Sequence, residues 1–127
     1  MIVFAETLGG IDTNSSDWTP LPGLFITLPR AAGEHALVIL NVPQPYATGN
    51  DYPGGQFSIE ANGGVLAPFA TFTYNEQQPQ STGRIPVTLC VRVALNQSSE
   101  TPVKAVWRGV RGSTVHIDSP ASLSAIL

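Results

Sequence analysis

The fold of this chain is decided by residues 85–96, which read IPVTLCVRVALN. Apolar side chains occupy every second position, at residues 85, 87, 89, 91, 93 and 95. This alternation is the period of a β-strand that buries one face. Pro86 falls near the start of the stretch, where a missing backbone donor is tolerated. The stretch therefore predicts a long β-strand against a hydrophobic core.

Short strand-like segments extend outward from this stretch in both directions. They lie at residues 24–28, 36–42, 57–60, 65–74, 103–110, 114–117 and 123–127. The turn Asn62-Gly63-Gly64 joins two of them, and Pro68 predicts an irregularity in the second. The eleven prolines and twelve glycines are spread throughout the chain and argue against long helices. We expect an all-β protein of about eight strands, arranged as a jelly-roll β-sandwich.

Length and composition restrict the possible partners. The 127 residues predict a single domain with its own core. Only 12% of the residues are charged, against about 25% in a typical domain, so uncharged polar residues or an oligomer must cover the surface. The net charge is −3 and no basic stripe is present, which argues against nucleic acid as a partner.

The sequence also bears on the cellular compartment. Cys90 is the only cysteine, so we interpret it as a structural thiol, and no intrachain disulfide can form. The first residues lack the features of a secretory signal, and no apolar run approaches the ~20 residues of a membrane helix. We expect synthesis in the cytoplasm without a signal peptide and no membrane insertion. Release or cell-surface display by a non-classical route stays open.

Two long polar loops, residues 43–56 and 75–84, are where a ligand site is expected on a rigid sandwich. The second loop ends in Ser81-Thr82-Gly83-Arg84. Two hydroxyls and a planar guanidinium suit an uncharged, polyhydroxylated ligand. Tyr46 and Tyr74 can supply flat apolar faces for a sugar ring. The set indicates a sugar-binding protein, although the same four residues can also form an ordinary loop.

From about residue 21 to residue 127 the chain resembles a known family, the bacterial TNF-like fucose-binding lectin domain. That domain is the N-terminal module of a two-headed superlectin. The matching runs are VILNVP (38–43), PYATGN (45–50), FTY (72–74), STGR (81–84), VRGS (110–113), HIDS (116–119) and ASLSAI (121–126). Residues 1–20 do not match clearly.

The resemblance implies a TNF-like jelly roll that assembles as a homotrimer and has no enzymatic activity. It implies fucose sites in the crevices between neighbouring subunits, without calcium or any other metal or cofactor. Fucosylated oligosaccharides would then be the partners. The residues that match the family's fucose contacts are Tyr46, Ser81, Thr82 and Arg84 from one subunit, and Thr73, Tyr74 and Arg111 from its neighbour.

Other matching positions lie at the periphery of the family's site. His116, Asp118 and Ser119 match positions near the mouth, where the next sugar of the glycan is met. The chain departs from the family at Gln56 and Pro120, where the family has tyrosines. We expect Gln56 to be a peripheral glycan contact.

Less specific interpretations remain for several of these residues. Arg84 could pair with a surface carboxylate, and Arg111 could cap a strand end or bridge subunits. His116 and Asp118 have a spacing that could serve a metal or a catalytic dyad, but a structural or peripheral role is favoured. Trp18 and Trp107 are expected to anchor the core or an interface, and Tyr52 to contribute packing only.

Two other functions stay open. One is a TNF/C1q-like structural trimerisation module without a sugar site. The other is a glycan-processing enzyme, for which Glu76 and Asp118 are the nearest, but weak, candidate carboxylates.

Overall fold

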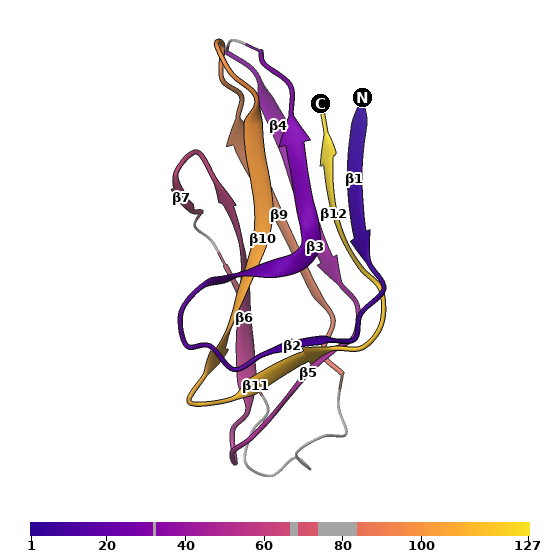
Figure 1. Ribbon diagram of the computed structural model, residues 1–127, viewed down its shortest axis with the longest axis vertical. Coiled ribbons are helices and arrows are strands. Elements are labelled where there is room, and N and C mark those ends of the chain that lie inside the picture. Colours follow the sequence, from indigo (N-terminus) through magenta and orange to yellow (C-terminus); the bar gives the residue numbers. More distant parts are fainter. Residues whose placement is uncertain (32, 67–68, 74–83) are drawn as a thin grey trace.

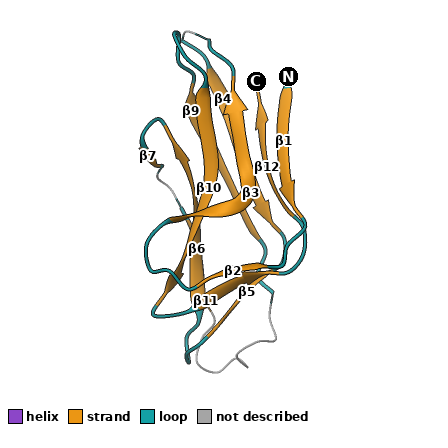
Figure 2. Cartoon of the chain, in the orientation of Figure 1, coloured by secondary structure: helices purple, strands orange, loops and turns teal. Residues whose placement is uncertain are grey.

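The structure is a computed structural model that describes residues 1–31, 33–66, 69–73 and 84–127 (Figure 1). Every regular element in these ranges is a β-strand, which confirms the expected all-β class (Figure 2). The strands are β1 (Ile2–Thr7), β2 (Ile11–Thr13), β3 (Thr19–Leu28), β4 (His35–Val42), β5 (Pro45–Thr48), β6 (Gly54–Ala61), β7 (Gly64–Val65), β8 (Ala70–Thr73), β9 (Val87–Ala94), β10 (Thr101–Val110), β11 (Thr114–Ile117) and β12 (Ala121–Ile126). The described part of the chain contains no helix long and apolar enough to span a membrane.

The strands form two larger sheets and one small one, in which all pairs are antiparallel. One sheet has the order β1-β12-β4-β9, and the other has the order β3-β10-β6-β7, with β8 also paired to β6. The small sheet β2-β11-β5 crosses one end of this sandwich-like arrangement (Figure 1). It positions several of the candidate site residues.

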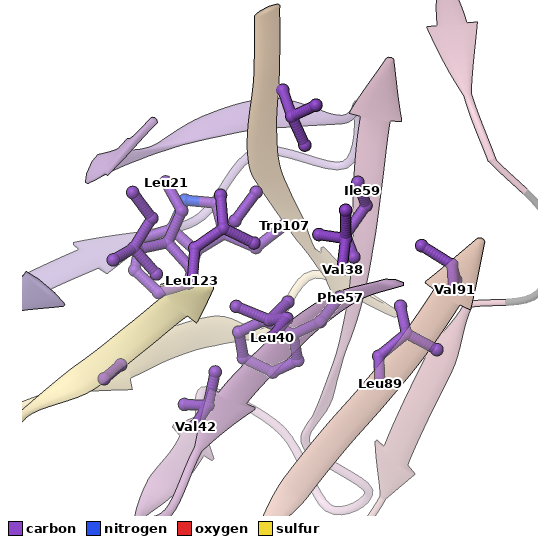
Figure 3. Close-up of a cluster of buried hydrophobic side chains, with 14 of the residues drawn as sticks. Leu21, Val38, Leu40, Val42, Phe57, Ile59, Leu89, Val91, Trp107 and Leu123 are labelled. Atoms are coloured by element: carbon purple, nitrogen blue, oxygen red, sulfur yellow. The ribbon is translucent and has the colours of Figure 1, made fainter. Parts of the chain in front are cut away.

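The core lies between the two larger sheets (Figure 3). Strand β9 alternates between buried and exposed side chains along its whole length, as its sequence predicts. Leu89 and Val91 lie beside Leu40 and Val38 of β4 and point into the same core. Trp107 of β10 is only 1% exposed, which confirms its expected role as an anchor. Each fully buried apolar side chain of this size contributes about 1.5–3 kcal/mol to stability.

Two expectations about the strands are wrong. Residues 43–56, expected to be one long loop, contain β5 and the first residues of β6. Strand β5 forms despite Pro45 because that residue begins the strand and offers its carbonyl oxygen to the Ile85 amide, 3.3 Å away. Residues 65–74, expected to be one strand, are divided between β7 and β8.

The N-terminal residues form two strands that the sequence analysis did not anticipate. Strand β1 pairs along its length with β12, from Ile2 opposite Ile126 to Thr7 opposite Ala121. Strand β12 lies between β1 and β4, and its Leu123 and Ala125 side chains are fully buried in the core of the chain. The chain itself therefore buries this side of the C-terminal strand.

The opposite side of the same sheet exposes apolar side chains near the two chain ends, with polar side chains such as Glu6, Ser124 and Arg92 beside them. Ile2, Ile126 and Leu37 lie in one row across β1, β12 and β4, and all three are exposed. Phe4 and Cys90 lie in the next row and are also exposed. We call this surface the apolar sheet face.

Candidate functional site

The small sheet brings two of the candidate residues together. Tyr46 of β5 lies opposite His116 of β11 in the strand register. Their rings are stacked with centroids 4.6 Å apart and planes 9° from parallel. The His116 ring nitrogen Nε2 lies 3.0 Å from the Thr48 hydroxyl and forms a hydrogen bond with it. The Tyr46 ring is thus held in one orientation at the surface, half-buried.

Arg84 completes this group. Its guanidinium carbon lies 4.4 Å from the centroid of the Tyr46 ring. Nη1 and Nη2 donate to the two carboxylate oxygens of Asp118, at 2.7 and 2.9 Å, and Nη1 also donates to the Gln44 carbonyl at 3.3 Å. The alternative that Arg84 pairs with a surface carboxylate is therefore confirmed.

This ion pair is partly exposed to water. The two side chains are 40% and 45% exposed, and a pair so accessible to water adds at most about 1 kcal/mol to stability. Its larger effect is on orientation, because a two-point contact fixes the plane of the guanidinium. Arginine has five N–H donors, and the Nε–H and one Nη2–H of Arg84 make no hydrogen bond within the described residues.

Arg111 is held in a second group, at the turn between β10 and β11. It has a φ of 52° and Gly112 has a φ of 74°, and the Ser113 amide donates to the Val110 carbonyl at 3.0 Å. Successive positive φ values define a tight hairpin turn, in which glycine or asparagine is the usual first residue. A non-glycine residue in the left-handed region is unfavourable by about 1–2 kcal/mol.

Residues of the loop between β5 and β6 hold Arg111 in place. Its Nε donates to the Tyr52 carbonyl at 3.1 Å, and its Nη2 donates to the same oxygen. The Asn50 side chain donates to the Arg111 carbonyl at 2.7 Å and to the buried Ser113 hydroxyl at 3.0 Å. Sequence reasoning missed Asn50 and expected only packing from Tyr52. The residue type could have indicated this role of Asn50, since asparagine side chains commonly form hydrogen bonds with backbone groups in turns.

Thr73 and Gln56 lie near one another on β8 and β6. Thr73 is exposed and pairs with Gly54, where an added Cβ would lie 2.4 Å from the Phe72 carbonyl oxygen. The glycine therefore permits the close approach of β8. The Gln56 amide donates to the Thr71 hydroxyl at 3.2 Å and accepts from Arg108 Nε at 2.6 Å. The amide nitrogen and the amide oxygen of Gln56 are therefore both hydrogen-bonded to residues of the same sheet.

Arg108 connects Gln56 to an aromatic cluster. Its guanidinium carbon lies 4.2 Å from the centroid of the Trp18 ring, and Trp18 contacts Phe69 edge to face at 5.7 Å. Trp18 is half-buried in this cluster, outside the core cluster that contains Trp107.

The structure describes only some of the remaining residues that were predicted for the site. Tyr74, Ser81 and Thr82 lie outside the described residues. Ser119 is half-buried beside Asp118, where Gly9 approaches its backbone so closely that an added Cβ would lie 2.5 Å from the Ser119 nitrogen. Among the described residues, no three His, Cys, Asp or Glu side chains are grouped to hold a metal.

The arrangement presents polar and aromatic groups at the surface. The first group consists of the half-buried Tyr46 ring, the Arg84 guanidinium and a neighbouring carboxylate, and the Arg111 and Thr73 side chains are exposed elsewhere. Comparison with protein families matches residues 9–126 to the family described as "Bc2l-C, N-terminal domain". The chain belongs to this family.

Membership of the Bc2l-C N-terminal domain family confirms the resemblance seen in the sequence to a bacterial TNF-like lectin domain. The family is one of carbohydrate-binding, non-enzymatic modules, so the chain is a module of lectin type. A search of curated proteins found no match to the chain.

Proposed function

We propose that this chain is a fucose-binding lectin that recognises fucosylated glycans at sites between the subunits of a TNF-like jelly-roll homotrimer. The observation that carries the proposal is the Arg84 guanidinium, which the Asp118 carboxylate orients beside the stacked Tyr46 and His116 rings. The guanidinium donors that make no hydrogen bond within the described residues can meet the hydroxyls of a deoxyhexose, and the exposed part of the half-buried phenol ring can meet its apolar side.

The chemistry of fucose fits these groups. The sugar is neutral, and when linked in a glycan it has three free hydroxyls and an apolar C6 methyl. Arginine can donate paired hydrogen bonds to neighbouring oxygens, and Tyr46 can pack against the C–H face or the methyl. In the proposal, Ser81 and Thr82 satisfy the remaining hydroxyls. Each hydrogen bond contributes only about 0.5–1.5 kcal/mol after exchange with water, so one site binds weakly and several sites on a trimer raise the avidity.

The second group would come from the neighbouring subunit. In the proposal, Arg111, Thr73 and Tyr74 face the first group across a subunit junction, with Gln56, His116, Asp118 and Ser119 at its periphery. The backbone of Arg111 supports a binding role, because strained residues that neighbouring contacts hold in place are enriched at functional sites.

The apolar sheet face supports assembly. Ile2, Phe4, Leu37 and Ile126 expose large apolar side chains on a continuous surface of a protein with few charges. Contiguous apolar surface of this kind is typical of protein–protein interfaces. We propose that copies of the chain bury this face against one another in the homotrimer.

Calorimetric titration tests the sugar site. We expect heat with L-fucose and none with mannose or galactose. Arg84→Ala should abolish the fucose signal, whereas Arg30→Ala, which changes an arginine outside both groups, should retain it. Silence of the unmodified protein with all three sugars would favour the TNF/C1q-like structural module. Normal fucose binding by Arg84→Ala would show that the site is wrongly placed.

Light scattering and thiol labelling test the assembly. The exposed Cys90 lies on the apolar sheet face, so a maleimide should label it slowly in the native trimer and quickly in a dissociated Phe4→Glu variant. A native protein that is monomeric at micromolar concentration would overturn the intersubunit site.

We further propose that the protein has no glycosidase activity and is made in the cytoplasm. An aryl-fucoside that releases phenol when incubated with the pure protein would overturn the first proposal. Secretion of the protein with cleavage of an N-terminal signal would overturn the second.

A further inference from the structure

A cavity away from the residues discussed so far lies on the β3-β10-β6-β7 sheet. Its volume is about 270 Å3, and it is lined by Phe25, Pro102, Lys104, Glu60 and the turn at residues 61–63. None of these residues belongs to the proposed fucose site. The strand register explains why they meet, because Phe25 of β3, Lys104 of β10 and Glu60 of β6 lie in one row across three neighbouring strands.

The Phe25 ring forms an apolar wall of this cavity. The side chain is 56% exposed. It points away from the core, whereas its neighbours in the strand, Leu24 and Ile26, are buried on the other face. An exposed aromatic ring at the edge of a cavity provides a flat surface for the C–H face of a sugar. Pro102 extends the apolar wall on the neighbouring strand.

The polar wall is a neutral ion pair. Lys104 Nζ lies 2.9 Å from Glu60 Oε2, and both side chains are only half exposed. The ammonium has three N–H donors, and the carboxylate has two acceptor oxygens, so each keeps hydrogen-bonding capacity beyond this contact. Because the two charges compensate each other, the wall favours neither an anion nor a cation. It can donate to and accept from the hydroxyls of a neutral molecule.

We propose that this cavity is a second carbohydrate site, contained within one subunit, that binds a single neutral pyranose ring. The ring packs one face on Phe25, and neighbouring hydroxyls bridge Lys104 and Glu60. A volume of about 270 Å3 lies just below the range of about 300–1,000 Å3 typical of sites that enclose drug-sized ligands, which favours one sugar ring over an enclosed chain. The inference rests on the carbohydrate-binding family and not on fucose recognition by Arg84.

A cross-strand pair can also serve the sheet alone. Opposite charges directly across two strands contribute about 0.2–1 kcal/mol to its stability. That role needs neither an exposed phenyl ring nor a cavity beside the pair. The test must therefore detect a ligand at the pair itself and depend on Phe25.

Lys104 is the only lysine of the chain, which gives a direct readout. Biosynthetic incorporation of lysine carrying carbon-13 at the ε-carbon labels Lys104 alone and leaves its three N–H donors in place. The full assembled protein is then titrated, by nuclear magnetic resonance, with the methyl glycosides of glucose and N-acetylglucosamine up to tens of millimolar. We expect at least one of them to shift the Lys104 signal in a saturable manner.

Two variants provide the controls. Phe25→Ala should abolish the Lys104 shift and leave L-fucose binding unchanged, whereas Phe69→Ala, which removes another exposed phenylalanine outside the cavity, should retain the shift. Arg84→Ala should abolish fucose binding and spare the Lys104 shift, so the two sites fail separately. A Lys104 signal that no glycoside moves, or a shift that persists in Phe25→Ala, would overturn the proposal.

Discussion

The ion pair between Arg84 and Asp118 predicts that its loss lowers the affinity for L-fucose more clearly than it lowers the free energy of unfolding. Asp118→Asn keeps the shape of the side chain and removes its charge, and with it the two-point hold on the guanidinium. Because the pair is exposed, its loss should change the free energy of unfolding by no more than about 1 kcal/mol. The proposed fucose site should be affected more clearly.

The expected loss of affinity follows from the freedom that Arg84 regains. Ordering one long side chain at the moment of binding costs about 0.5–1.5 kcal/mol. Since about 1.4 kcal/mol corresponds to tenfold in affinity, Asp118→Asn should weaken L-fucose binding about two- to tenfold. The free monosaccharide is the right ligand, because contacts of Asp118 with a second sugar then play no part.

Calorimetric titration and urea unfolding measure the two effects side by side. Asp17→Asn is the matched control, since Asp17 is exposed and forms no ion pair within the described residues. High salt should weaken fucose binding of the unmodified protein toward the level of Asp118→Asn and change the variant little, because salt screens exposed pairs. Unchanged affinity in Asp118→Asn would refute the orienting role, and tighter binding would show that the carboxylate competes with the sugar for Arg84.

Two further predictions concern Arg111, in the turn after β10, and Gly109, near the end of β10. Arg111→Asn should abolish fucose binding with little change in the urea midpoint, because asparagine tolerates the left-handed backbone and this gain of about 1–2 kcal/mol offsets the lost hydrogen bonds to Tyr52. Retained binding by this variant would exclude Arg111 from the site. Gly109→Ala should be destabilising by about 1–3 kcal/mol or more, because its Cβ would lie 2.1 Å from the Ser113 carbonyl oxygen. An unchanged urea midpoint would contradict the close approach of these backbones.

The all-β class was predictable because its signal is local. Residues 87–94 alternate in the sequence as they do in burial, so β9 follows directly from its side chains. Strand β5 was not predictable in this way, since Pro45 and the neighbouring Asn and Gly residues resemble a loop, and its pairing with β11 involves residues about 70 positions away. Strand β1 was not predicted, since residues 1–5 are all apolar and do not alternate, and its partner β12 lies at the other end of the chain.

The candidate site was predictable in part. The resemblance identified Tyr46, Arg84, His116 and Asp118, and the structure brings these four together. The ion pair itself could not be derived, because Arg84 and Asp118 are 34 positions apart and meet only when β11 packs beside β5. The hold on Arg111 by Asn50 and Tyr52 likewise depends on a loop whose course the sequence does not specify.

The position of β12 has a consequence for how the protein is made. This strand follows all the others in the sequence, yet it lies between β1 and β4 and forms hydrogen bonds with both. A ribosome therefore releases all the other strands of the described residues before β12, which joins β1 to β4, is available. Until then β4 has an open edge, and unpaired edges of apolar strands invite association with other chains. Premature termination just before residue 121 should therefore yield an aggregating product rather than a smaller folded domain.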